Sequence, residues 1–288
     1  MKNEMNSIKI EGEIAGIKIG DPYKVRLLGI INLSKESFFK QSISTDPEDV
    51  IKKVGKFIDE GADFIDIGAR STAPGVKPIP IKEELEQLLP SLKAILKNYE
   101  IPVSVDTQYS DIADKALNLG AQIINDVSGF KTDPKIIDTI VDHEADVIIM
   151  ASKKIPGDCL GIAQTIQELK NSIKKIEDKG LKTTKIIIDP GIGKWIPQKH
   201  SYYNLELIDK LQEFRILKKP ILVGISRKSF IGDVLNYPNP KDRLIGTFAC
   251  TSIAVYNGAH IVRTHDINGT RDIVDMVWKL KNYESDFK

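Results

Sequence analysis

The 288-residue chain predicts a closed (β/α)8 TIM barrel, and three observations support this fold class. Short β-rich runs alternate with amphipathic helical runs about eight times. The β-rich runs stop abruptly at polar residues, which a buried parallel strand does not place in its interior. The length also suits this barrel, which typically takes about 250 residues in a single domain. We therefore expect one barrel domain over residues 1–288, with an open doubly wound sheet as the alternative.

One complete repeating unit lies between residues 101 and 129. A β-rich run at 102–105 ends at Asp106 and is followed by a helical pattern that has Ser110 as its predicted N-cap and Gly120 as its C′ glycine. A second run, 121–124, ends at Asn125 and Asp126. Two strands joined by a helix run parallel, so their polar carboxyl ends meet at one rim of the barrel.

The rest of the chain repeats this order. Residues 8–20 alternate with period two around a glycine and predict a β-hairpin outside the repeat, placed to plug one end of the barrel. The other predicted strands are 26–31, 63–67, 146–150, 185–188, 221–225 and 261–262. The other predicted helices are 47–59, 82–96, 135–141, 162–178, 205–214, 243–256 and 272–280.

Composition excludes several classes of partner. The 41 basic and 40 acidic residues give a net charge of +1, so we expect neither nucleic acid nor an anionic membrane surface as a partner. No apolar run reaches the roughly 18 residues of a membrane span. Cys159 and Cys250 are too few for a disulfide framework, which favours a reducing compartment and a cytoplasmic location.

The polar strand ends are expected to surround one cavity, because functional residues of such barrels share the carboxyl-terminal face. They are Asn32, Asp106, Asn125, Asp189, Lys228, Arg263 and His265. Any one of the acids or amides alone is more often a turn former. Together, carboxylates and an amide suit a flat polar heteroaromatic ring, while the lysine, arginine and histidine supply donors for an anion. The expected substrate has a polar ring at one end and negative charge at the other.

Two further segments allow more than one interpretation. Gly191 and Gly193 follow a strand-end Asp-Pro and favour a sharp turn over a phosphate-binding nest. Residues 226–229, Ser-Arg-Lys-Ser, form either a phosphate clamp or a solvated basic loop.

Seven segments, in order, resemble the signatures of the dihydropteroate synthase family. They are LLGIINLSKESF, GADFIDIGARSTAPG, PVSVDTQ, GAQIINDVSG, IIIDPGIGK, LVGISRKSFIG and GAHIVRTHD, between about Leu27 and Asp266. The resemblance implies a pterin-binding barrel enzyme, and the most specific of these signatures are GISRKSFIG and IIIDPGIGK.

The resemblance also implies an activity and residue roles. The family condenses 6-hydroxymethyl-7,8-dihydropterin diphosphate with p-aminobenzoate and releases diphosphate, which implies these two small-molecule substrates and a homodimer. By position, Asp106, Asn125, Asp189 and Lys228 correspond to its pterin pocket, and Asn32 to the residue that contacts Mg²⁺ on the diphosphate. Arg263 and His265 correspond to its anion-binding pair, and Ser229 and Thr72 to positions near the arylamine. The catalytic set implied is Asp106, Lys228, Arg263 and His265.

The departures from the family pattern lie on the arylamine side. Glu36 replaces an Asp in the first loop, Arg70 and Ala73 replace a Glu and an Arg in the second, and Lys153 and Lys154 follow the fifth strand where a His is usual. Three interpretations follow. In the favoured one, Arg70 with Lys153 or Lys154 restores the charge and the synthase is active. In the second, the acceptor is a larger ribosylated, phosphorylated arylamine of the kind used in methanopterin synthesis. In the third, the chain is a non-catalytic pterin-binding protein or a pterin-dependent methyltransferase.

Overall fold

Eight parallel strands form a closed barrel in the computed structural model, which describes residues 8–34, 46–70, 76 and 79–283. The strands are β3 (Arg26–Asn32), β4 (Phe64–Gly68), β5 (Val103–Asp106), β6 (Ile123–Asp126), β7 (Asp146–Met150), β8 (Ile186–Asp189), β9 (Leu222–Gly224) and β10 (Ile261–Thr264). The sheet order is β8-β7-β6-β5-β4-β3-β10-β9. A parallel bridge between Ile188 and Ile221 joins the two outer strands. The predicted barrel is confirmed, and the open sheet is wrong.

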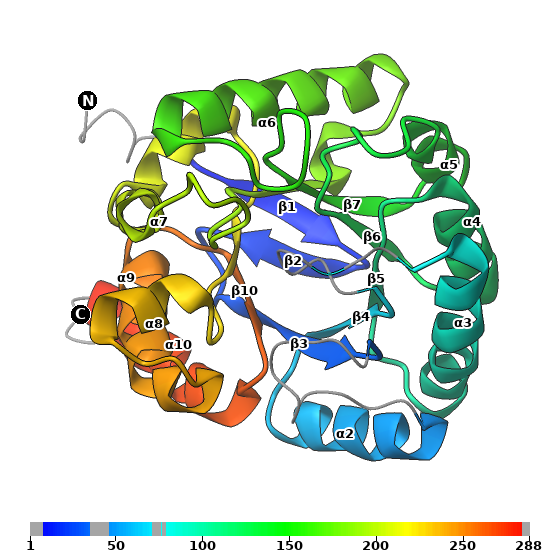
Figure 1. The fold of residues 1–288 in the computed structure, drawn as a ribbon, viewed down its shortest axis with the longest axis horizontal. Helices are drawn as coiled ribbons and strands as arrows, with labels where there is room; N and C mark the ends of the chain where they lie inside the picture. The colour runs from blue at the N-terminus through cyan, green and yellow to red at the C-terminus, as the bar shows by residue number, and fades with distance from the viewer. Residues whose placement is uncertain (1–7, 35–45, 71–75, 77–78, 284–288) are drawn as a thin grey trace.

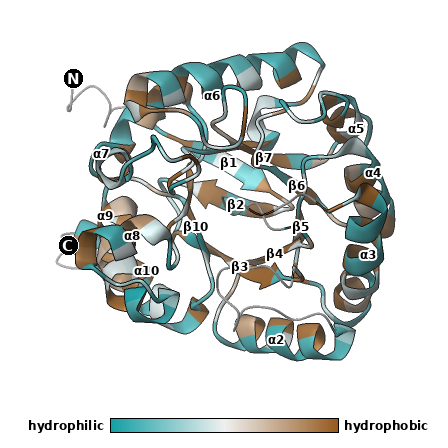
Figure 2. Ribbon diagram, in the orientation of Figure 1, coloured by the Kyte–Doolittle hydropathy of each residue, from teal (hydrophilic) through white to brown (hydrophobic). Residues whose placement is uncertain are grey.

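Helices surround this barrel (Figure 1). They are α2 (Pro47–Asp59), α3 (Ile81–Asn98), α4 (Ser110–Leu119), α5 (Ile136–Asp142), α6 (Gly161–Asp178), α7 (Ser201–Asp209), α8 (Ser229–Leu235), α9 (Leu244–Tyr256) and α10 (Ile267–Asn282). Hydrophilic and hydrophobic segments alternate along α2, α3 and α6, as amphipathic helices require (Figure 2). No helix within the described ranges is long and apolar enough to cross a bilayer.

The amino-terminal hairpin closes the end of the barrel opposite the polar strand ends. Strands β1 (Glu11–Ile14) and β2 (Ile17–Gly20) pair antiparallel, as predicted. Ile14 and Ile19 are buried against apolar residues at the amino ends of the barrel strands, among them Phe64. The backbone N–H of Ala15 donates to Asp146 Oδ2 at 2.6 Å. The β1–β2 hairpin therefore plugs the amino-terminal end of the barrel, and the carboxyl-terminal rim is the open end.

Several element boundaries differ from the predictions. Ser110 is the first residue of α4 and not its N-cap, because its N–H and its hydroxyl both donate to Asp133. Gly120 does adopt the left-handed conformation predicted for it, at φ +114°.

The predicted helix 205–214 is two elements. Helix α7 ends at Asp209, and a 3-10 helix over Leu211–Leu217 continues the chain and buries Leu211 and Phe214. Helix α8 was not predicted, because its seven residues are too short to show a helical period. Helix α10 begins at Ile267, earlier than predicted, where Thr270 Oγ1 donates to the carbonyl of Asp266.

Candidate active site

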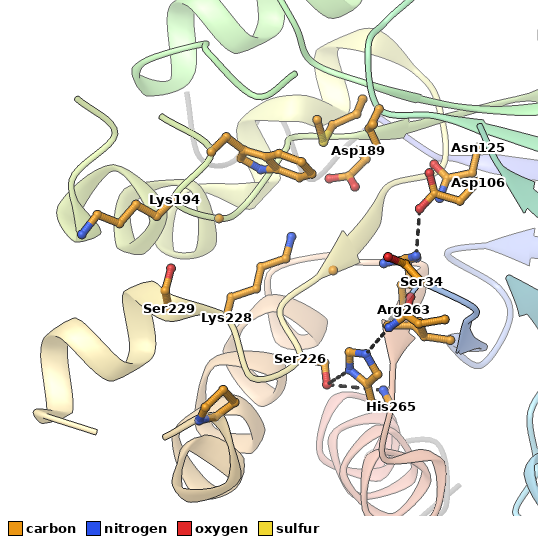
Figure 3. Close-up of a pocket in the computed structure, with 18 of the residues that line it drawn as sticks. Ser34, Asp106, Asn125, Asp189, Lys194, Ser226, Lys228, Ser229, Arg263 and His265 are labelled. Carbon is orange, nitrogen blue, oxygen red and sulfur yellow. Dashed lines mark hydrogen bonds and ion pairs between the residues drawn. The ribbon is translucent and has the colours of Figure 1, made fainter. Parts of the chain in front are cut away.

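A cavity of about 630 Å³ opens at the carboxyl-terminal rim (Figure 3). Eight of the nine predicted site residues line it: Asn32, Asp106, Asn125, Asp189, Lys228, Ser229, Arg263 and His265. They come from strand ends, loops and the first residue of α8, spread over more than 230 positions of the chain, and parallel strand geometry gathers them at one rim. The ninth, Thr72, lies outside the described residues.

Arg263 lies at the centre of an ion-pair network on one side of the cavity. Its Nε is 2.6 Å from Asp66 Oδ2, and its Nη2 is 3.0 Å from Asp106 Oδ2. Asn125 Nδ2 donates to the same Asp66 oxygen at 3.3 Å. Burial raises the pKa of Asp106, and the guanidinium opposes that shift. Arg263 was expected to serve an anion, but here its charge is shared with two protein carboxylates.

Asp66 was missed in the sequence, although a signal for it exists. It is fully buried in β4, inside the otherwise apolar run Phe64–Gly68. An acid in the middle of a buried parallel strand is costly unless it is paired, so such a residue calls for a cationic partner.

His265 lies at the rim between Ser226 and Asn32. Its Nδ1 lies 2.9 Å from Ser226 Oγ (Figure 3). Its Nε2 lies 3.4 Å from Asn32 Nδ2. Burial lowers its pKa well below the ordinary value, and the nearby charge of Arg263 lowers it further. Both effects, which come from the protein's own groups, favour the neutral imidazole.

Asp189 and Lys228 form the opposite side of the cavity. Asp189 Oδ1 accepts the N–H of Gly191 at 2.7 Å, and Lys228 Nζ donates to the carbonyl of Ile192. The same ammonium lies 5.1 Å from the centre of the Trp195 ring. Burial lowers the pKa of Lys228 to about 8, against the opposing effect of Asp189. Figure 3 shows the lysine reaching across the cavity toward Asp189.

The glycines after β8 form a turn and not a phosphate nest. Gly191 has φ +72° and Gly193 has φ +142°, both in the region that favours glycine. The N–H of Gly191 donates to Asp189, and the N–H of Gly193 donates to Asn204 Oδ1 at 2.5 Å. Since both donors are used within the protein, the turn interpretation holds.

Three residues of the segment 226–229 line the cavity, and the fourth forms an ion pair outside it. Ser226, Lys228 and Ser229 line the cavity. Arg227 points elsewhere: its Nε and Nη2 donate to the Asp266 carboxylate at 2.9 and 2.6 Å. That pair ties the end of β9 to the end of β10. The segment is thus not a solvated basic loop, and Arg227 takes no part in any phosphate clamp that the other three residues form.

Arg70 lines the cavity but is anchored beneath it. Its Nε lies 2.6 Å from Glu84 Oε2, Nη2 donates to the carbonyl of Ile79 at 2.5 Å, and the guanidinium lies 4.7 Å from the Tyr109 ring centre. Burial raises the pKa of Glu84, and the pairing with Arg70 opposes this. Glu36 and Ala73 lie outside the described residues.

The structure does not bring Lys153 or Lys154, expected to restore charge on the arylamine side, to the described cavity. Both side chains are exposed and are not among the cavity-lining residues. Their backbone N–H groups instead donate to the Asp158 carboxylate, at 2.7 and 3.0 Å. Cavity-lining cations that were not predicted are Lys194, which pairs with Asp233 at 2.9 Å, and Arg243.

The fold and the site together define a barrel enzyme whose rim cavity is lined by acids, an amide and cations. The chain matches the pterin binding enzyme family over residues 28–265.

The relatives narrow this class further. A dihydropteroate synthase from Synechocystis is 35% identical over 265 residues, covering 88% of this chain and 90% of the relative. The dihydropteroate synthase of Bacillus subtilis is 33% identical, covering 90% of each chain. A Coxiella burnetii dihydropteroate synthase solved with pteroic acid is 33% identical, with a TM-score of 0.83 and coverage of 95% of this chain and 99% of that one. The chain belongs to the dihydropteroate synthase family.

Proposed function

We propose that this chain condenses 6-hydroxymethyl-7,8-dihydropterin diphosphate with p-aminobenzoate and releases diphosphate. The observation that carries the proposal is that Asp106, Asn125, Asp189 and Lys228 line one cavity at the barrel rim. A Xanthomonas albilineans dihydropteroate synthase solved with 4-aminobenzoic acid supports the choice of acceptor; it is 29% identical with a TM-score of 0.83.

The reaction is a displacement at the methylene carbon of the pterin. The arylamine nitrogen forms a bond to that carbon while the bond from the carbon to a diphosphate oxygen breaks, and the nitrogen loses a proton. The pterin gains positive charge on the way to the transition state, and the leaving group gains negative charge. Asp106 and Asp189 stabilise the first, because their carboxyl groups line the cavity at fixed positions.

Hydrogen bonds orient the ring at this end of the cavity. Asn125 and Asp106 offer a donor and acceptors on one side of the cavity, and Asp189 offers acceptors from the opposite side, as a flat heteroaromatic guest requires. Lys228 supplies a further donor from the opposite wall. No nucleophilic side chain is needed, because the arylamine attacks the pterin directly.

We propose that Mg²⁺ binds together with the diphosphate group of the substrate. Among the described residues no cluster of three or more His, Cys, Asp or Glu side chains forms a resident metal site. Asn32, at the end of β3, offers an amide oxygen at the rim beside His265. That donor fits an ion held mainly by phosphate oxygens and water, which is how Mg²⁺ commonly binds. When bound, Mg²⁺ would neutralise charge on the departing diphosphate.

We also propose a homodimer in a reducing, cytoplasmic setting. Helices α9 and α10 expose large apolar side chains, including Ile245, Ile253, Tyr256 and Met276. An apolar surface of this kind is typical of an interface between subunits. Both cysteines are free thiols, which suits a reducing compartment.

The test is a diphosphate-release assay on the purified chain. Release should require the dihydropterin diphosphate, Mg²⁺ and p-aminobenzoate together. The larger ribosylated, phosphorylated arylamine of methanopterin synthesis is tested in parallel. If diphosphate is released with that arylamine and not with p-aminobenzoate, the larger arylamine is the acceptor. Pterin uptake with no diphosphate release from either acceptor would favour a non-catalytic binding protein instead.

A further inference from the structure

A fully buried lysine lies behind the cavity wall and has no part in the chemistry proposed above. Lys199 has a relative exposure of 0%. Its Nζ donates to two backbone carbonyls, that of Gly191 at 2.7 Å and that of Gly157 at 3.2 Å. Burial lowers its pKa to about 8. A buried amine is costly to keep, so its bonds to these two carbonyls require an explanation.

The two carbonyls belong to different loops of the rim. Gly157 lies in the loop that follows β7, and Gly191 lies in the turn that follows β8. The loop after β7 is itself fixed, because the N–H of Gly157 donates to Ser152 Oγ and that hydroxyl donates to the carbonyl of Val127. Lys199 thus connects the turn after β8 to the loop after β7, which Ser152 in turn connects to Val127.

The peptide groups on both sides of Gly191 are held in place. Its N–H donates to the cavity-lining carboxylate of Asp189, and its carbonyl accepts both Lys199 Nζ and Trp195 Nε1, the latter at 3.1 Å. The Trp195 ring in turn packs closely against Gly157, where a Cβ atom would come within 2.1 Å of the ring. The indole therefore has little freedom while the lysine stays bonded.

Trp195 is the link between this anchor and the site. It lines the cavity, and the ammonium of Lys228 lies 5.1 Å from its ring centre. A shift of the turn would move the indole, the carbonyl of Ile192 that accepts Lys228, and the donor to Asp189 together.

We propose that Lys199 is a positioning residue, which fixes the turn after β8 and so sets the position of Trp195 and Lys228 in the cavity. Its role in turnover rests on the proposed synthase activity; its role in fixing Trp195 does not. It acts through backbone carbonyls and touches no reacting atom.

The test compares Lys199→Met with a matched control, Lys219→Met. Lys219 is also a buried lysine, 4% exposed, and its Nζ bonds to Glu177 and Thr183 away from the cavity. Both variants lose the bonds of a buried ammonium and keep a side chain of similar length. They are made in a Trp278→Phe background, so that Trp195 is the single tryptophan and can be excited selectively over tyrosine.

Two readouts separate positioning from stability. Acrylamide quenching of Trp195, measured without substrate, should rise about twofold in Lys199→Met, because the turn opens more often. The value of kcat/KM for p-aminobenzoate should fall about tenfold, mainly through KM, since a displaced wall costs orientation. Lys219→Met should change neither, although its Tm falls.

Lys199→Gln serves as a second variant, because its amide can still donate to a carbonyl. It should lie between the wild type and Lys199→Met in quenching. Unchanged quenching in Lys199→Met, an equal change in Lys219→Met, or a glutamine variant no closer to the wild type would each overturn the proposal. The quenching arm decides this even if the wild type shows no turnover, a result that would instead refute the proposed function.

Discussion

Replacing Arg263 by methionine removes the positive charge shared by two carboxylates at the centre of the site. Asp66 is fully buried, and the side chains of Asp106 and Arg263 are 13% and 20% exposed. Removing one partner of a buried ion pair typically costs about 3–5 kcal/mol, and the partial exposure of Arg263 favours the lower end, about 3 kcal/mol. At about 2–4 °C per kcal/mol, Tm should fall by about 6–12 °C.

The loss should depend on pH, with a sign that follows from the carboxylates. Burial already raises the pKa of Asp106, and loss of the guanidinium raises it further. At pH 8 both acids are ionised in the unfolded chain, and the variant carries the full deficit. At pH 5, protonating a carboxyl group of ordinary pKa about 3.9 costs only about 1.5 kcal/mol. In the folded variant one of the two carboxyl groups can therefore become neutral, which relieves the repulsion left by the missing guanidinium. The difference in the free energy of unfolding between variant and wild type should therefore become smaller as pH falls from 8 to 5.

Urea unfolding at both pH values measures this gap. The control is Arg271→Met, which removes a comparable pair with Asp63, at 2.8 Å and 22% and 15% exposed. Asp63 keeps its contact with Arg26 at 3.1 Å, so the control should lose less stability and keep its substrate KM. The double variant Arg263→Met with Asp66→Asn should recover most of the lost stability but not the activity. A cost below about 1 kcal/mol at pH 8 in the single variant would refute the assigned role of the ion pair.

Three further changes follow from the structure. Lys228→Met should lower kcat/KM and remove its decline above pH 8, because the lysine is charged below its pKa of about 8 and loses that charge above it; a pH-rate profile that keeps the decline would contradict this. Ile14→Ala should cost about 2–4 kcal/mol in urea unfolding, by leaving a cavity in the barrel plug, with KM unchanged. Ile253→Glu, on the exposed face of α9, should yield monomers in sedimentation velocity, and an unchanged sedimentation coefficient would exclude this face as the interface.

The sequence predicted the barrel well because its signals are local and repeated. Each strand end carries an abrupt change from apolar to polar residues, as at Asp106, Asn125 and Asp189, and parallel topology then places those ends on one rim. Helix α2 and strand β7 match their predicted ranges, because a Pro at the start of the first and a continuous apolar run in the second leave little choice.

What could not be predicted depends on contacts between distant segments. Nothing near Arg263 in sequence shows that Asp66, 197 positions away, takes up its charge. His265 is predicted from the sequence as an anion-binding residue, and only the structure shows that burial and the neighbouring Arg263 lower its pKa. Nothing near Lys199 in sequence shows that it is buried, with its ammonium bonded to carbonyls of the loops after β7 and β8.

The most direct test is detection of the condensed product by mass spectrometry after the purified chain is mixed with dihydropterin diphosphate, Mg²⁺ and p-aminobenzoate. We expect 7,8-dihydropteroate in amounts well above the enzyme concentration, and its loss when Asp189 is replaced by Ala. A pterin that binds and is recovered unchanged, or a product that still forms at the wild-type rate without the Asp189 carboxylate, would contradict the assignment of the rim cavity as the catalytic site.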